Sequence, residues 1–206
     1  MNNAHLYFCS PVYTSENPEF LISVSEVSEE LLAKSVDDPH EIFPMLHTDN
    51  FADDPRVADF CRFLAETGWN ILKDQGYAMD NFSVSVDAAW TQKHFKHSSM
   101  EQHVHGGSQL IGVYFLETPE GSSRPLFHDP RAGKVQNFLP ESNPNEATMA
   151  SNVINFEPKP GRLIITNAWL PHSFSRHASD KPLKFVHFNL SAFYSPPAKC
   201  STAEVI

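Results

Sequence analysis

The spacing of apolar residues divides this chain into two regions that meet near Asp80. Residues 17–35 place apolar side chains three and four positions apart with acidic residues between them, which predicts an amphipathic helix beginning at Asn17. Residues 54–76 show the same spacing, and Asp54 followed by proline is typical of a helix start. The predicted buried stripe of this second helix consists of Val57, Phe60, Cys61, Leu64, Trp69 and Leu72.

Short alternating segments replace this pattern after Asp80. Phe82, Val84 and Val86 alternate with polar residues, so they share one face of an expected strand. Further short apolar runs follow, bounded by turn residues, which gives about seven or eight strands. Residues 134–152 are polar and contain two prolines, and we expect them to form a loop over one face.

Helices followed by many short strands predict a mainly β fold with flanking helices, either a β-sandwich or a jelly roll. We expect a single domain, residues 1–206. In it a helical part, residues 1–80, would pack on a jelly-roll core, residues 81–196.

Composition and charge narrow the possible partners. The chain is 41% hydrophobic with 16 Phe, enough for a substantial core. The net charge of -10 and the lack of Lys/Arg-rich runs argue against nucleic acid. No stretch of about eighteen apolar residues or signal peptide is present, so no membrane span is predicted. Cys9, Cys61 and Cys200 form no CxxC pair, which favours a reducing, cytoplasmic location over a disulfide framework.

Three of the 11 histidines form a candidate metal site. His103 and His105 lie two residues apart, so in an extended segment both imidazoles point to one side. His172 follows a hydrophobic strand and can reach the same cavity from a neighbouring strand. Zinc, iron and copper all accept imidazole nitrogen. His94 and His97 lie in a polar segment and are expected on the surface.

Carboxylates near these histidines leave an alternative open. Two histidines and one carboxylate form the facial triad of non-haem Fe(II) oxygenases. Asp129, after His128 in "LFHDPR", could supply that carboxylate, or it could cap a turn and pair with Arg131. Glu101 shares its parity with His103, but three ligands from one strand give poor facial geometry.

Two longer stretches, "HVHGGSQLIGVYFLETPEGSSRPLFHDPR" and "FEPKPGRLIITNAWLPHSFSRH", resemble the Fe(II)- and 2-oxoglutarate-dependent oxygenases, in particular the prolyl-hydroxylase-like group. The similar region covers residues 82–194. The resemblance implies a double-stranded β-helix, a cupin-like jelly roll. It also places His103, His105 and His172 at the iron positions, with His105 where the family has a carboxylate.

The resemblance further implies a basic residue that binds the far carboxylate of the cosubstrate. No Arg stands at the family's position, and Lys184 is the residue expected to replace it. Tyr114 or Ser108 could hydrogen-bond the same carboxylate, and Arg131 could bind either the cosubstrate or the substrate.

The function implied is hydroxylation of a small molecule or a protein side chain, with succinate and CO2 formed from 2-oxoglutarate. One alternative is a three-histidine dioxygenase that needs no cosubstrate, which fits a site without a carboxylate. Another is a non-catalytic jelly roll that binds a structural metal. The pattern indicates no particular oligomeric state.

Overall fold

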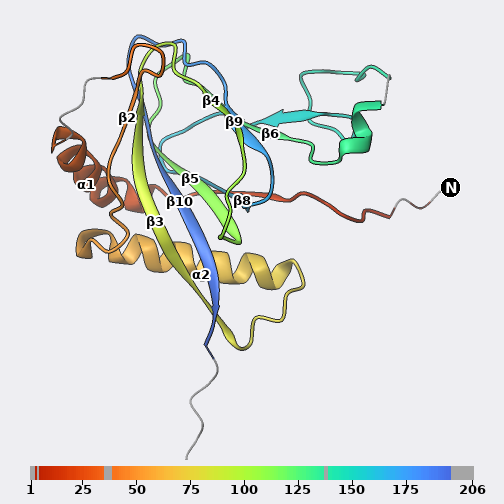
Figure 1. The fold of residues 1–206 in the computed structure, drawn as a ribbon, viewed down its shortest axis with the longest axis horizontal. Coiled ribbons are helices and arrows are strands. Elements are labelled where there is room, and N and C mark those ends of the chain that lie inside the picture. Colours follow the sequence, from red (N-terminus) through yellow and green to blue (C-terminus); the bar gives the residue numbers. More distant parts are fainter. Residues whose placement is uncertain (1–2, 4, 35–38, 137–138, 196–206) are drawn as a thin grey trace, which may run out of the picture.

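The computed structural model of this protein describes residues 3, 5–34, 39–136 and 139–195. Two helices and two antiparallel sheets make up the described chain (Figure 1). The helices are α1 (Leu21–Lys34) and α2 (Ala58–Asp74). The strands are β1 (Val12–Glu16), β2 (Met45–His47), β3 (Phe82–His94), β4 (Met100–His103), β5 (Leu110–Glu117), β6 (Pro125–His128), β7 (Val153–Asn155), β8 (Arg162–Asn167), β9 (His172–Phe174) and β10 (Leu183–Tyr194).

A large and a small sheet face each other. The large sheet has the strand order β1-β8-β5-β10-β3-β2, and the small sheet has the order β4-β9-β6-β7. Figure 1 shows β4, β9 and β6 on one side of the large sheet and both helices on the other. This is the double-stranded β-helix with flanking helices, and the predicted fold class is confirmed.

The helices cover the outer face of the large sheet with apolar side chains. The predicted start at Asp54 is confirmed, because its side chain accepts a hydrogen bond from the backbone of Arg56, whereas the side chain of Asn17 makes no such capping bond. A short 3-10 turn precedes each helix. The predicted stripe of α2 packs against the sheet, although Cys61 and Trp69 are only half-buried. Figure 1 shows α2 running across the strands β3 and β10.

A second apolar cluster fills the space between the two sheets. Its buried members include Phe115, Phe127, Phe174 and Phe185. The rings of Phe174 and Phe185 are stacked, with centroids 4.6 Å apart. One half of the barrel interior is therefore packed with aromatic side chains, which leaves the other half for polar ones.

Gly112 marks the closest approach between strands on the helix side. A Cβ atom there would lie 2.3 Å from the ring of Phe188 and 2.5 Å from the backbone oxygen of Ile164. Because real Cβ atoms do not approach so closely, only glycine fits at this position.

A β-bulge in β3 decides which of its residues face the interior. Leu190 of β10 pairs with Val86, and Asn189 pairs with Ala88, so Asp87 is the extra residue. Such an insertion exchanges the two faces of the strand beyond it. Val86 packs on the helix side, whereas Trp90, four residues further on, faces the interior.

The N-terminal region differs from its predicted helical character. It contains β1 and β2, which form the two edges of the large sheet. Both strands are short, and tertiary pairing with β8 and β3 rather than a strong alternation creates them. The described residues of the polar stretch after Lys134 do form a loop, and Cys200 lies outside the described residues. Within the described chain, neither helix has the length and apolar character needed to span a bilayer.

Candidate metal centre

The three predicted histidines meet between the two sheets. One ring nitrogen from each of His103, His105 and His172 lies within 4.8 Å of the others. Their ring centroids are 4.3 to 5.2 Å apart. Among the described residues this group contains no carboxylate. The structure thus brings together one imidazole nitrogen from each of three histidines.

Strand pairing positions these side chains. His103 at the end of β4 lies opposite His172 at the start of β9. His105 follows β4, and its backbone nitrogen donates to the carbonyl of Ala168. The i and i+2 spacing and the strand after Pro171 therefore lead to one site, as the sequence predicted.

Hydrogen bonds at one nitrogen fix the direction of each ring. In all three histidines the Nδ1 atom is bonded to an oxygen of another residue. The pairs are His103 with the backbone carbonyl of Glu101 (2.8 Å), His105 with Oδ1 of Asn189 (2.8 Å) and His172 with the backbone carbonyl of Leu170 (2.9 Å). Since Nδ1 donates its hydrogen, Nε2 keeps its lone pair and can bind a metal.

The Nε2 atoms of His105 and His172 are buried and have no hydrogen-bond partner. Burial lowers the pKa of His105, and it lowers the pKa of His172 to about 4. Both imidazoles are therefore neutral near pH 7, which is the form that ligates metals. A buried nitrogen without a partner costs free energy unless something binds it.

Two further buried histidines share this interior. His187 on β10 is 1% exposed, and its ring lies 4.9 Å from that of His105. His94 on β3 is also buried, so the prediction that it lies on the surface was wrong. The bulge at Asp87 is the reason, because it turns the end of β3 inward. No periodicity in the sequence indicated His187.

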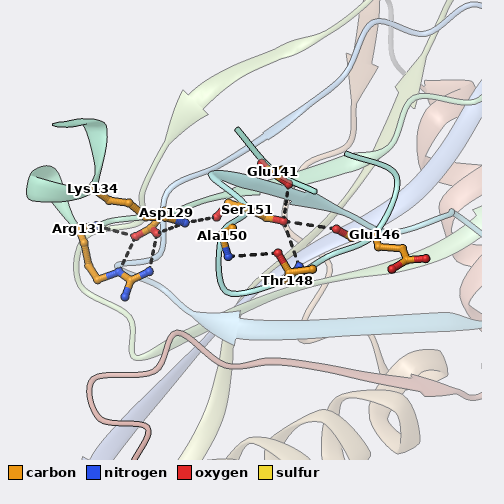
Figure 2. A network of polar contacts seen from close by, with 8 residues as sticks. All are labelled: Asp129, Arg131, Lys134, Glu141, Glu146, Thr148, Ala150 and Ser151. Carbon is orange, nitrogen blue, oxygen red and sulfur yellow. Dashed lines mark hydrogen bonds and ion pairs between the residues drawn. The ribbon is translucent and has the colours of Figure 1, made fainter. Parts of the chain in front are cut away.

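Asp129, the alternative carboxylate ligand, is paired with two basic side chains and does not lie in the histidine group (Figure 2). Its carboxylate accepts hydrogen bonds from Arg131 at 2.7 and 2.9 Å and lies 3.1 Å from Nζ of Lys134. These cations hold the pKa of Asp129 well below its usual range. Arg131 is thus occupied by Asp129, and His128 bonds to Ser173 at 2.8 Å. The structure brings none of the three into the histidine group.

Lys184 and Tyr114 lie on the helix side of the large sheet. Lys184 forms ion pairs with Glu29 (2.5 Å) and Glu117 (3.0 Å). The hydroxyl of Tyr114 donates to the backbone carbonyl of Asn17 (2.6 Å). Strand alternation explains both placements, since Lys184 shares its face with Val186 of β10 and Tyr114 shares its face with Leu110 of β5, and both of these pack on the helix side. The structure does not bring either predicted cosubstrate contact to the histidines.

Two cavities adjoin the site, and His105 lines both. The histidine cavity, of about 370 Å³, is lined by Trp90, Gln92, His103, His105, His187 and Asn189 among others. The aromatic cavity, of about 530 Å³, includes Tyr77, Phe82, Ser108 and Trp169. Neither cavity is lined by a Lys, Arg, Asp or Glu of the described chain.

The comparison with known families decides the class. A family model described as "Putative 2OG-Fe(II) oxygenase" matches residues 88–189, about half of the chain. This region contains all three clustered histidines. The chain belongs to the Fe(II)- and 2-oxoglutarate-dependent oxygenases. The description of this family names 2-oxoglutarate and Fe(II).

Solved structures share this fold at low sequence identity. The α-ketoglutarate-dependent epimerase SnoN from nogalamycin biosynthesis is 14% identical, with a TM-score of 0.58 over 91% of this chain and 82% of that one. A Pseudomonas putida prolyl-4-hydroxylase is 9% identical, with a TM-score of 0.56 over 87% and 92%. HygX from Streptomyces hygroscopicus, with nickel, 2-oxoglutarate and hygromycin B bound, is 12% identical, with a TM-score of 0.56 over 88% and 83%. A search of curated protein sequences finds no match.

Proposed function

We propose that His103, His105 and His172 hold the iron of a hydroxylase. One observation carries this assignment: all three Nδ1 atoms are engaged by oxygens, and the Nε2 atoms of His105 and His172 are buried without partners. Three imidazole nitrogens within 4.8 Å of one another fit a divalent metal of the first transition row. The donor set differs from the facial triad because a histidine replaces the carboxylate.

The chain's own residues would bind the metal, position the substrate and exclude water. When bound, iron with 2-oxoglutarate supplies the oxidising chemistry that hydroxylates a C–H bond, with succinate and CO2 as co-products. Asn189 fixes the ring of His105. The aromatic rings of the β9 and β10 region shield the interior from solvent.

The substrate is proposed to be a small molecule or a protein side chain that enters through the aromatic cavity. That cavity shares His105 with the metal site. The exposed rings of Tyr77, Phe82 and Trp169 at this cavity favour contact with an apolar group. The long loop after Lys134 borders a different pocket, next to the N-terminal segment, so we assign it no role in closure.

The first test replaces one ligand and measures two properties. His172→Ala removes one of three donors, and we expect the affinity for Ni(II) or Fe(II) to fall by more than tenfold. Succinate formation from 2-oxoglutarate by the Fe(II)-loaded protein under air should fall with it. Metal affinity is measured by calorimetry with Ni(II), and succinate by chromatography.

His128→Ala is the matched control, because His128 lies on the neighbouring strand but bonds to Ser173. Asp129→Asn tests the carboxylate alternative. Both variants should keep the metal affinity of the unmodified protein. Loss of metal in Asp129→Asn, with retention in His103→Ala, would show that Asp129 is a ligand and that the three-histidine assignment fails.

A second candidate, the three-histidine dioxygenase without a cosubstrate, is favoured by one observation. No Lys or Arg of the described chain lines the histidine cavity, and Lys184 is paired on the other face of the sheet. Failure of the metal-loaded protein to bind 2-oxoglutarate would favour this candidate.

A further inference from the structure

The histidine cavity lacks the cation that a dicarboxylate ordinarily meets. 2-Oxoglutarate carries two carboxylates, and only one end can bind the metal together with the keto oxygen. The other carboxylate needs hydrogen-bond donors once it is removed from water. Since the cavity is lined by no Lys or Arg of the described chain, those donors must be groups other than Lys and Arg side chains.

His187 is the side chain of this lining whose polar atoms are all buried without a partner. Its residue is 1% exposed, and neither Nδ1 nor Nε2 has a hydrogen-bond partner. The side chain lines the histidine cavity beside Gln92. The ring packs on Trp90, with centroids 4.8 Å apart, which fixes its position against the wall.

A second buried histidine, His177, has hydrogen-bond partners within the chain for both ring nitrogens and serves as a comparison. His177 is fully buried, yet both of its nitrogens are bonded. Nδ1 accepts from the backbone nitrogen of Ser123 (3.2 Å), and Nε2 donates to the carbonyl of Lys181 (2.8 Å). A buried polar group normally has a partner. His187 departs from this rule inside a ligand cavity, so a ligand is the partner expected.

The position of His187 also separates it from the metal ligands. Its ring centroid lies 4.9 Å from that of His105, but it is 6.4 Å from that of His103 and 6.0 Å from that of His172, so it is near one member of the group and far from the other two. Its nitrogens do not belong to the group within 4.8 Å. His187 therefore lies next to the metal site rather than in it.

We propose that His187 binds the carboxylate of 2-oxoglutarate that does not bind the metal, in place of the absent basic residue. Gln92 is the second candidate donor, because its side chain lines the same cavity and is held by His94 at 3.0 Å. This inference rests on the proposed function. It makes His187 a cosubstrate-binding residue on the opposite face of β10 from Lys184.

The test compares two oxo acids on two proteins. 2-Oxopentanoate has the same five-carbon chain as 2-oxoglutarate but lacks the second carboxylate. Affinities are measured by calorimetry with the Ni(II)-loaded protein, which binds without turnover. The unmodified protein should prefer 2-oxoglutarate by about tenfold or more, the effect of hydrogen bonds to a charged group.

His187→Leu keeps the bulk of the ring but removes both nitrogens. We expect its preference for 2-oxoglutarate to fall to within about twofold of unity, while its affinity for 2-oxopentanoate stays the same. His187→Gln retains a donor and should restore part of the preference. His128→Leu is the matched control, a histidine outside the cavity, and should behave as the unmodified protein.

Three other results would each refute a different part of the proposal. An unmodified protein that binds Ni(II) but neither oxo acid would refute the proposed function. A His187→Leu variant that keeps the full preference for 2-oxoglutarate would refute the role of His187 alone. A His187→Leu variant that loses Ni(II) as His172→Ala does would make His187 a metal ligand and overturn the inference. Thermal melting of each variant verifies that it is folded.

Discussion

The two faces of the large sheet differ in whether their buried polar groups have hydrogen-bond partners. On the helix side, Lys184 is paired with two glutamates and the hydroxyl of Tyr114 is bonded to a backbone carbonyl. On the barrel side, ring nitrogens of His94, His105 and His187 are buried without a partner. The same strand, β10, supplies both Lys184 and His187.

This difference supports the proposal that the barrel face of the large sheet is the one that binds a ligand. Each unpaired buried polar group costs about 1–3 kcal/mol. A fold that carries several such groups in one cavity is more stable with a metal and a ligand bound to them. The helix face has its polar groups satisfied by the chain itself and serves as structural support. The predictions below compare the two faces directly.

The largest effect is expected from adjacent residues of β10 that face opposite ways. Phe188 is buried against the helices, so Phe188→Ala should lower the free energy of unfolding by about 3–5 kcal/mol. His187→Leu removes two unpaired nitrogens without leaving a cavity, so the metal-free variant should be as stable as the unmodified protein or more so. Urea unfolding of the metal-free proteins measures both. An equal loss in the two variants would mean that His187 has an internal partner.

A smaller effect is expected from pH, and it belongs to the barrel face. Burial lowers the pKa of His94 from 6.5 to about 4. The unfolded chain therefore takes up a proton at a higher pH than the folded one. The stabilisation is fully present above pH 6.5 and is lost as the pH falls towards 4, by up to about 3 kcal/mol for this residue.

Urea unfolding of the metal-free protein across this pH range gives the measurement. His94→Leu should make the curve less steep, because it removes one of the buried histidines whose pKa is lowered. His5→Gln, an exchange of an exposed residue, should leave the slope unchanged. The same slope in His94→Leu as in the unmodified protein would assign the pH dependence to the other buried histidines.

The smallest effect is expected on the helix face. Lys184→Met removes two ion pairs whose glutamates are about half exposed, and water can solvate these carboxylates. We expect a change in stability of about 1 kcal/mol or less. The affinity of the Ni(II)-loaded protein for 2-oxoglutarate should not change. A tenfold loss of that affinity would return Lys184 to the role of cosubstrate anchor, and calorimetry decides this.

The cluster of three histidines was predictable because local spacing largely determines it. Residues two apart on an extended segment share a side, so His103 and His105 had to act together. His172 follows a hydrophobic strand, which brought it to the same sheet. The start of the second helix was also a local signal, since Asp54 accepts a hydrogen bond from the backbone two residues further on. In each case a few neighbouring residues contain the information.

The cosubstrate contacts were not predictable in this way. Lys184 was chosen by its distance along the chain from His172, but the face on which it lies depends on the register of β10 with its neighbours. The extra residues at the two register shifts of β10 lie in β5 and β3, so the alternation along β10 is unbroken and Lys184 shares the face of Val186. Only the pairing of β10 within the sheet shows that this face is the one covered by the helices.

The sequence by itself thus determined the fold class, the helix starts and the three clustered histidines, because periodicity and short spacings are properties of adjacent residues. Only the tertiary structure decided that His94 is buried, that His187 joins the cavity and that Lys184 faces the helices. These outcomes depend on bulges and on pairing between strands far apart in the chain. Their cause is the packing of two sheets and a helix layer, which no single segment contains.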